Sequence, residues 1–189
     1  MFSQNAQLFF APPNLHPPPP GDYGVLHLLR RDICFCFGWD PFTSSPTSHP
    51  TFWPGGMAIL AGIDLIAKFY AGEDTIGNVG SRFRAFITRY FQPLSTGDEE
   101  TIYQLRNALL HSFGLYSYSR RRIYKFKLSA QRSPLIQHFP PDEYQIDLFT
   151  LHDHFENSIQ LYVTDLDTNQ TLQDNFMAMF PKYGVIHIG

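Results

Sequence analysis

The residues of this chain best suited to chemistry form one short run, Arg106-Asn107-Ala108-Leu109-Leu110-His111. The run brings a permanent cation, an amide and an imidazole close together. RNA carries its own nucleophile in the ribose 2′-hydroxyl, so a protein needs only to move a proton near neutral pH and to place a cation beside the phosphate. Histidine and arginine suit these two tasks. The run therefore indicates cleavage of a phosphodiester bond that requires no metal and no other cofactor.

The spacing of Arg106 and His111 is weak evidence by itself. In a chain of this composition, about 0.4 pairs of an arginine followed five positions later by a histidine are expected by chance. Asn107 and the helical setting make the match more specific. Positions five apart on a straight helix differ by about 140° in direction, so the two side chains are not expected to share a face within one chain, although an arginine is long enough to reach partly round the helix. Two copies about a two-fold axis would supply both groups to one cleft, so the motif predicts a homodimer. The structural alternative is an ion-pair or capping role, since a helix C-terminus favours histidine.

The pattern resembles the R-x4-6-H motif of the HEPN superfamily, whose members are helical bundles and whose nucleases usually carry a polar residue directly after the arginine. The resemblance covers about residues 53–113. It implies a dimeric, metal-independent ribonuclease in which His111 is the acid or base, Arg106 stabilises charge on the phosphorane, and Asn107 orients the histidine or the phosphate.

The same resemblance implies a biological setting. Some HEPN nucleases are toxins of toxin–antitoxin or defence systems, so RNA and an antitoxin protein are the expected partners. Toxins of this kind often extend the motif to R-x4-6-H-x-Y, whereas this chain has Ser112 and Phe113 after His111. Regulation through that tyrosine is therefore not expected. Many HEPN domains are non-catalytic, and the alternative function is a module that binds a nucleotide, RNA or a protein.

The net charge of −3 hides two blocks of opposite sign. Residues 82–132 hold ten of the fourteen Lys and Arg against three acids, a balance of +7, and residues 133–189 have a balance of −7. This pattern indicates either a polyanion-binding face in the middle segment or neutralisation of that face by the tail. The candidate RNA-binding side chains are the basic residues Arg82, Arg84, Arg120, Arg121, Arg122, Lys125 and Lys127.

Three tyrosines, Tyr116, Tyr118 and Tyr124, are interleaved with these cations and could stack on bases. An edge hairpin protected by its charges explains the same pattern equally well. Other chemistry has less support. Two histidines of His152-Asp153-His154 diverge on a helix, and Cys34 with Cys36 has neither disulfide nor zinc-knuckle spacing, so no metal site is predicted. Motifs of NTPases, Rossmann folds and α/β-hydrolases are absent from the sequence.

Periodic apolar residues predict the elements that must position the motif. The predicted helices span about residues 22–39, 53–70, 78–91, 98–113 and 150–163, and a shorter helical piece is expected at about 172–180. In the third helix Arg82, Arg84 and Arg89 lie off the apolar stripe and are expected at the surface. The period changes to two after Gly114, which predicts one or two strands, and residues 185–188 are a further strand candidate.

The expected architecture is mainly α. Residues 1–20 are a Pro-rich arm, and residues 21–189 form one HEPN-like bundle of four to five helices, with a small β element at about 114–129 and an acidic, helical C-terminal part. The apolar segment 57–70 is interrupted by Gly62, Asp64 and Lys68, which argues against a membrane span. The N-terminus does not have the pattern of a signal peptide, so a cytoplasmic location is expected.

Overall fold

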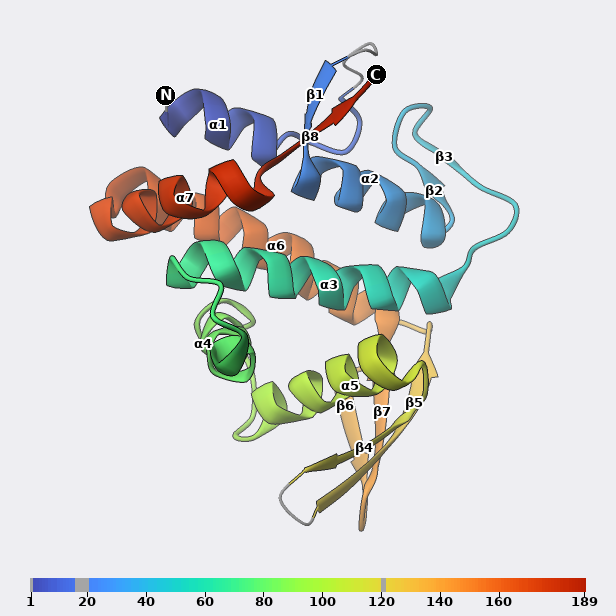
Figure 1. The fold of residues 1–189 in the computed structure, drawn as a ribbon. Helices are drawn as coiled ribbons and strands as arrows, with labels where there is room; N and C mark the ends of the chain where they lie inside the picture. The colour runs from blue at the N-terminus through green and yellow to red at the C-terminus, as the bar shows by residue number, and fades with distance from the viewer. Residues whose placement is uncertain (1, 16–20, 120–121) are drawn as a thin grey trace.

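The structure is a computed structural model that describes residues 2–15, 21–119 and 122–189. Runs of helices and runs of strands follow one another along these residues (Figure 1). The elements are α1 (Phe2–Phe9), β1 (Gly21–Gly24), α2 (Val25–Cys36), β2 (Trp39–Asp40), β3 (Ser45–Pro46), α3 (Phe52–Ala71), the 3-10 helix η1 (Ile76–Asn78), α4 (Val79–Tyr90), α5 (Asp98–Ser112), β4 (Tyr116–Ser119), β5 (Arg122–Ser129), β6 (Ile136–Phe139), β7 (Glu143–Asp147), α6 (Leu148–Thr168), α7 (Gln170–Tyr183) and β8 (Val185–Ile188).

Helix α3 lies at the centre and packs against α2, α4, α5, α6 and α7 (Figure 1). Small residues let these helices approach: a Cβ added at Gly62 would lie 2.6 Å from the Phe155 ring. The helix ends at Gly72, whose φ of 68° suits glycine. By length and composition α3 could cross a membrane, but half of its most apolar window is buried inside the fold. Packing against five helices accounts for its apolar composition.

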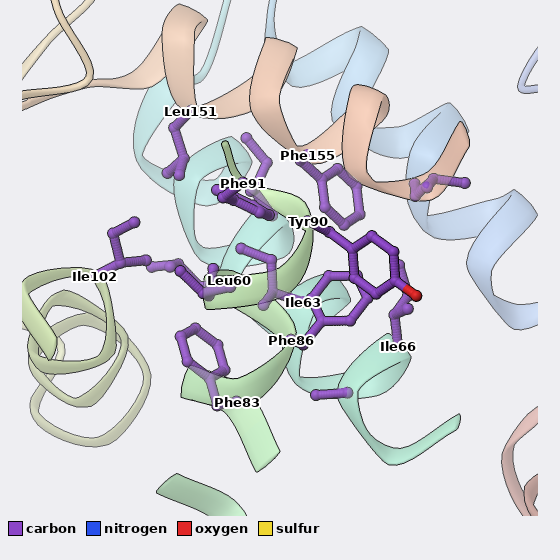
Figure 2. Close-up of a cluster of buried hydrophobic side chains, with 14 of the residues drawn as sticks. Leu60, Ile63, Ile66, Phe83, Phe86, Tyr90, Phe91, Ile102, Leu151 and Phe155 are labelled. Atoms are coloured by element: carbon purple, nitrogen blue, oxygen red, sulfur yellow. The ribbon is translucent and has the colours of Figure 1, made fainter. Parts of the chain in front are cut away.

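The core is built around α3 from large aromatic and branched side chains (Figure 2). The apolar spacing of α4 predicts a stripe of Val79, Phe83, Phe86, Ile87 and Tyr90. The last four side chains are buried, whereas Val79 is only partly buried. Phe155 of α6 belongs to the same cluster, and α6 packs against both α3 and α4. Burial of such side chains stabilises the fold by roughly 1.5–3 kcal/mol each.

The predicted fold class is wrong, because the chain is an α+β mixture rather than a helical bundle with one β element. Helices make up 58% and strands 18% of the described residues, and the strands form three small sheets. Strands β6 and β7 fall between Pro134 and Asp147, where runs of four and five residues give little periodic signal. Their pairing is non-local: β7 lies parallel to β5, with Lys125 opposite Glu143. Local patterning cannot reveal such a pairing.

The sheets join distant parts of the sequence. The largest has the order β4-β5-β7-β6, with β5 and β7 parallel and the other neighbours antiparallel. The predicted strand at 185–188 is confirmed as β8, which pairs with β1. Helix α1 was not predicted, and its Phe9 is fully buried against Phe69 and Phe176. The N-terminal segment is thus docked on the helical core.

Candidate functional site

Helix α5 carries the motif and has well-defined ends. It begins after Gly97, whose φ is 94°, and the carboxylate of Asp98 accepts a hydrogen bond from the Ser95 amide at 2.8 Å. Ile102, Leu105 and Leu109, the main positions of its predicted apolar stripe, are fully buried, whereas Phe113, the further candidate for this stripe, is 71% exposed. It ends at Phe113, where the Gly114 amide bonds to the Ala108 carbonyl at 3.1 Å. Only the last turn, with His111, is exposed.

Arg106 is the centre of the site. Its Nε donates to Asp64 Oδ2 at 3.0 Å, and its Nη2 donates to the same oxygen. Its Nη1 bonds to Asn107 Oδ1 at 3.2 Å and to His111 Nε2. The Arg106 and Asp64 side chains are 10% and 15% exposed. The structure therefore gathers all three predicted catalytic residues around one guanidinium group.

Arg106 and His111 meet within one chain. The two positions differ in direction on the helix, and the long arginine side chain reaches around the helix to the imidazole. Since a guanidinium group can only donate, His111 Nε2 accepts this bond. A neutral His111 then carries its proton on Nδ1. The lone pair of Nε2 becomes available once another group accepts the hydrogen bond from Arg106 Nη1.

Asp64 is the site residue that sequence reasoning missed. It lies on α3, far from the motif in sequence, and its Oδ2 takes both bonds from Arg106. Its other oxygen, Oδ1, is buried and has no hydrogen-bond partner among the described residues. The signal was a carboxylate in the middle of an apolar helical segment. Such a residue needs a cation nearby, because an isolated charge is costly to bury.

Arg82 does not lie where the helical stripe predicted. It is 5% exposed rather than a surface group, and its Nη1 donates to the Thr75 carbonyl at 2.6 Å. This bond ties α4 to the turn that precedes η1. Arg82 is therefore a buried structural residue, and it does not form part of the candidate RNA-binding surface.

Arg84 and Arg122 lie at the other end of α5, away from His111. Arg84 pairs with Glu100 at 3.1 Å, and Arg122 lies over the rings of Tyr124 and Tyr144. They line a cavity of about 450 Å³ together with Glu99, Glu100, Ser119 and Tyr124. Acids and bases balance there, and the first turn of α5 lies about 20 Å from His111 along the helix. The cavity is not part of the motif site. Arg120 and Arg121 lie outside the described residues.

The two charge blocks meet in the folded chain. Among the described residues, cations of residues 82–132 form four ion pairs with acids of residues 133–189: Lys125 with Asp142 at 3.0 Å, Lys127 with Glu143 at 2.6 Å, Arg132 with Asp153 at 2.8 Å and Arg89 with Asp165 at 2.9 Å. The hydrogen bond from Arg89 helps to lower the pKa of Asp165. Neutralisation by the tail, one of the two interpretations of the charge pattern, therefore operates at these four positions.

The remaining candidates have structural roles. His152 and His154 stack on different rings, Phe37 and Phe91, so they diverge as predicted. No group of three metal-ligating side chains occurs within residues 2–15, 21–119 and 122–189. Burial raises the pKa of Cys34 to about 11, which makes its thiol a poor nucleophile. These observations leave the Arg106 cluster as the strongest site.

Comparison with known proteins adds no relative: no family model, curated protein or solved structure matches this chain. The functional argument therefore depends on the geometry around Arg106.

Proposed function

We propose that this chain is a metal-independent endoribonuclease of the HEPN type. The observation that carries the proposal is the cluster at the exposed end of α5, where the Arg106 guanidinium group contacts His111, Asn107 and Asp64. A cation, an imidazole and a carboxylate that orients the cation are the groups required to cleave RNA through its own 2′-hydroxyl.

Each residue has a defined task in this mechanism. A phosphate of the substrate replaces His111 as the partner of Arg106 Nη1, which frees His111 Nε2 to take the proton of the 2′-hydroxyl. The 2′-oxygen then attacks phosphorus, the bond to the 5′-oxygen breaks, and the products are a 2′,3′-cyclic phosphate and a 5′-hydroxyl end. Arg106 stabilises the charge on the phosphorane, and Asp64 holds Arg106 in place through Nε and Nη2.

A homodimer completes the proposed site. Each chain offers one motif histidine, whereas the reaction uses a base for the 2′-hydroxyl and an acid for the leaving oxygen, so two copies supply both. Apolar residues beside the site support such an interface. Trp53, Met57 and Ala61 recur every four residues along α3 and are exposed or half-exposed, and Phe113 at the end of α5 is 71% exposed.

The proposed setting follows from the resemblance alone. A ribonuclease of this kind acts on cytoplasmic RNA and is held in check by an antitoxin protein. We propose the toxin half of a toxin–antitoxin or defence pair.

A non-catalytic HEPN-like module is the second candidate. One observation favours it: the charge of Arg106 is already neutralised by Asp64 in the free chain. Such a module binds a nucleotide, RNA or a protein partner and shows no turnover. Cleavage assays separate the two candidates directly.

The test is cleavage of a fluorescently labelled RNA in EDTA by the wild type and by Arg106→Ala and His111→Ala. We expect both variants to lose activity by about 10² to 10⁴-fold, and wild-type products to end in a 2′,3′-cyclic phosphate. His187→Ala is the matched control, because His187 is an exposed histidine on β8 paired with Asp22. An inactive wild type, or full activity in both variants, contradicts the proposal.

A further inference from the structure

The four-stranded sheet β4-β5-β7-β6 has two different faces. On its inner face Tyr124, Phe126 and Tyr144 are buried, each at most 4% exposed, whereas Arg122 and His138 of the same face are exposed. Side chains alternate along a strand, so their neighbours point to the opposite side. We call this opposite side the outer face; it consists of Tyr116, Tyr118, Ile123, Lys125, Lys127, Gln137, Phe139, Glu143 and Gln145. None of these residues is buried.

The outer face is aromatic at its edges and charged in its middle. Strand register places Tyr116, Lys125, Glu143 and Phe139 in one row across all four strands. Tyr116, Tyr118 and Phe139 are 52%, 63% and 45% exposed. Aromatic side chains of this size usually bury their rings, so this much exposure in one face indicates a binding surface.

The helices lie on the other side of the sheet. In β4 the residue between the two tyrosines, Ser117, is buried and donates to Gln104 of α5 at 2.5 Å. Helix α5 therefore packs on the side opposite Tyr116 and Tyr118. In the described part of the chain, the helices with extensive contacts to this sheet are α5, to β4 and β5, and α6, to β7. The outer face has no comparable cover.

We infer that the outer face binds single-stranded RNA, with bases stacked on Tyr116 and Tyr118. The inference rests on the proposed function for its ligand class. Alternate residues of a strand lie about 7 Å apart, twice the roughly 3.4 Å between bases in a duplex strand. Two tyrosines at this spacing suit unstacked bases of a single strand, which can lie on aromatic rings in any sequence. A duplex presents no base faces to them.

The outer face also carries two lysines, Lys125 and Lys127, which can contact phosphate groups after exchanging the acidic partners that neutralise them in the free chain. Lys125 and Lys127 are 53% and 61% exposed in side chain, and each is held only by an ion pair at the surface. Such pairs exchange readily with a phosphate, since they are solvated and screened by salt. The core of a protein interface is usually depleted of charged residues, whereas this face has lysines and Glu143 in its middle.

The outer face is close to the proposed catalytic residues along the chain. Tyr116 follows His111 by five residues, so their Cα atoms lie at most about 18 Å apart. The exposed ring of Phe113 lies between them in sequence. An RNA strand held on Tyr116 therefore has phosphates within a few nucleotides of His111.

The test uses full-length His111→Ala protein, which prevents cleavage, and a fluorescein-labelled, unstructured 12-nucleotide RNA. Fluorescence anisotropy measures its Kd and that of the same RNA annealed to its complement. We expect the single strand to bind at least ten-fold more tightly than the duplex. Tyr116→Ala and Tyr118→Ala are each expected to weaken single-strand binding about ten-fold.

Controls separate stacking from folding. Tyr116→Phe and Tyr118→Phe keep the ring and are expected to bind within two-fold of the parent protein. Trp39→Ala removes an equally exposed aromatic ring from β2 and is expected to leave Kd unchanged. Equal affinity for the duplex, or unchanged affinity in the double tyrosine-to-alanine variant, would overturn the inference.

Two further outcomes separate this inference from the proposed function. A dimer that becomes monomeric in the double alanine variant, with RNA affinity unchanged, would make the outer face an interface between copies and overturn RNA binding there. If the double alanine variant cleaves RNA through His111 with full activity and binds it with full affinity, the inference is overturned and the proposed ribonuclease function stands. If the wild-type protein binds RNA through the two tyrosines but does not cleave it, the inference is supported and the proposed ribonuclease function is contradicted.

Discussion

Arg82 and Arg106 are two buried arginines on successive helices, and they differ in what they bond. Arg82 is 5% exposed and donates to a backbone carbonyl, that of Thr75. Arg106 is 8% exposed and contacts a carboxylate and an imidazole. A backbone carbonyl is fixed by the fold, whereas side-chain partners at an exposed helix end can be exchanged for a substrate. Burial alone therefore does not mark a functional arginine; the nature of its partners does.

The largest expected difference between the two arginines appears in the cleavage rate when each is replaced by lysine. Arg106→Lys is expected to lower the cleavage rate about 10³-fold. The planar guanidinium group can donate to Asp64 and to a phosphate at the same time, whereas the compact ammonium group of lysine cannot. Arg82→Lys is expected to keep full specific activity. Initial rates are measured at a temperature where circular dichroism shows both variants folded. Similar losses in the two variants would mean that the distinction between the arginines is false.

Removing the carboxylate tests the same comparison through stability. Asp64→Ala leaves the Arg106 guanidinium group without its counter-charge and is expected to lower the free energy of unfolding by about 3 kcal/mol. Arg82→Met removes one hydrogen bond to a carbonyl and is expected to cost only about 1–2 kcal/mol. Urea unfolding at pH 7 measures both. A smaller loss for Asp64→Ala than for Arg82→Met contradicts the expected order.

Asp147 extends the comparison to a buried anion held by fixed groups. Desolvation opposes its ionisation, but hydrogen bonds from Thr150, Gln131, Ser129 and Ser133 together lower its pKa to about 2. A carboxylate whose pKa is lower in the folded state stabilises the protein fully above its unfolded pKa of about 3.9, and this contribution is lost as pH falls toward 2.

Asp147→Asn is therefore expected to lower the free energy of unfolding by about 2 kcal/mol at pH 7. The difference from the wild type is expected to shrink between pH 5 and pH 2, while cleavage at pH 7 stays unchanged. Urea titrations at pH 7, 5 and 3 measure the trend. A difference that is constant with pH would show that ionisation of the Asp147 carboxyl group does not contribute to the stability of the fold.

The sequence predicted the parts of the fold that depend on local periodicity. Helices α3, α4 and α5 and the buried stripe with Phe83 and Phe86 follow from apolar spacing. The pairing of β5 with β7 depends on residues far apart in sequence, such as Lys125 and Glu143, and could not be read from a local window. The same limit hid α1, whose Phe9 is fixed by α3 and α7.

The candidate site shows the same division. Arg106 and His111 were found because they are close in sequence and of suitable types. Asp64 was recognised only as an interruption of an apolar segment, because its partner lies on another helix. Arg82 was placed at the surface because a helical stripe describes only apolar positions. A long cationic side chain can fold back under a turn and bond to a carbonyl, and no spacing rule predicts that.

The ion pairs between the two charge blocks have a consequence for the chain during its synthesis. Translation runs from the N-terminus, so residues 82–132 emerge before residues 133–189. In that interval the segment of +7 charge has none of the four acids that later pair with it. It is then beside the ribosome's own RNA, to which such a charge is attracted. A nascent chain that stalls between the two blocks is therefore expected to be attracted to ribosomal RNA more strongly than the folded chain, in which acids of the second block pair with four of these cations.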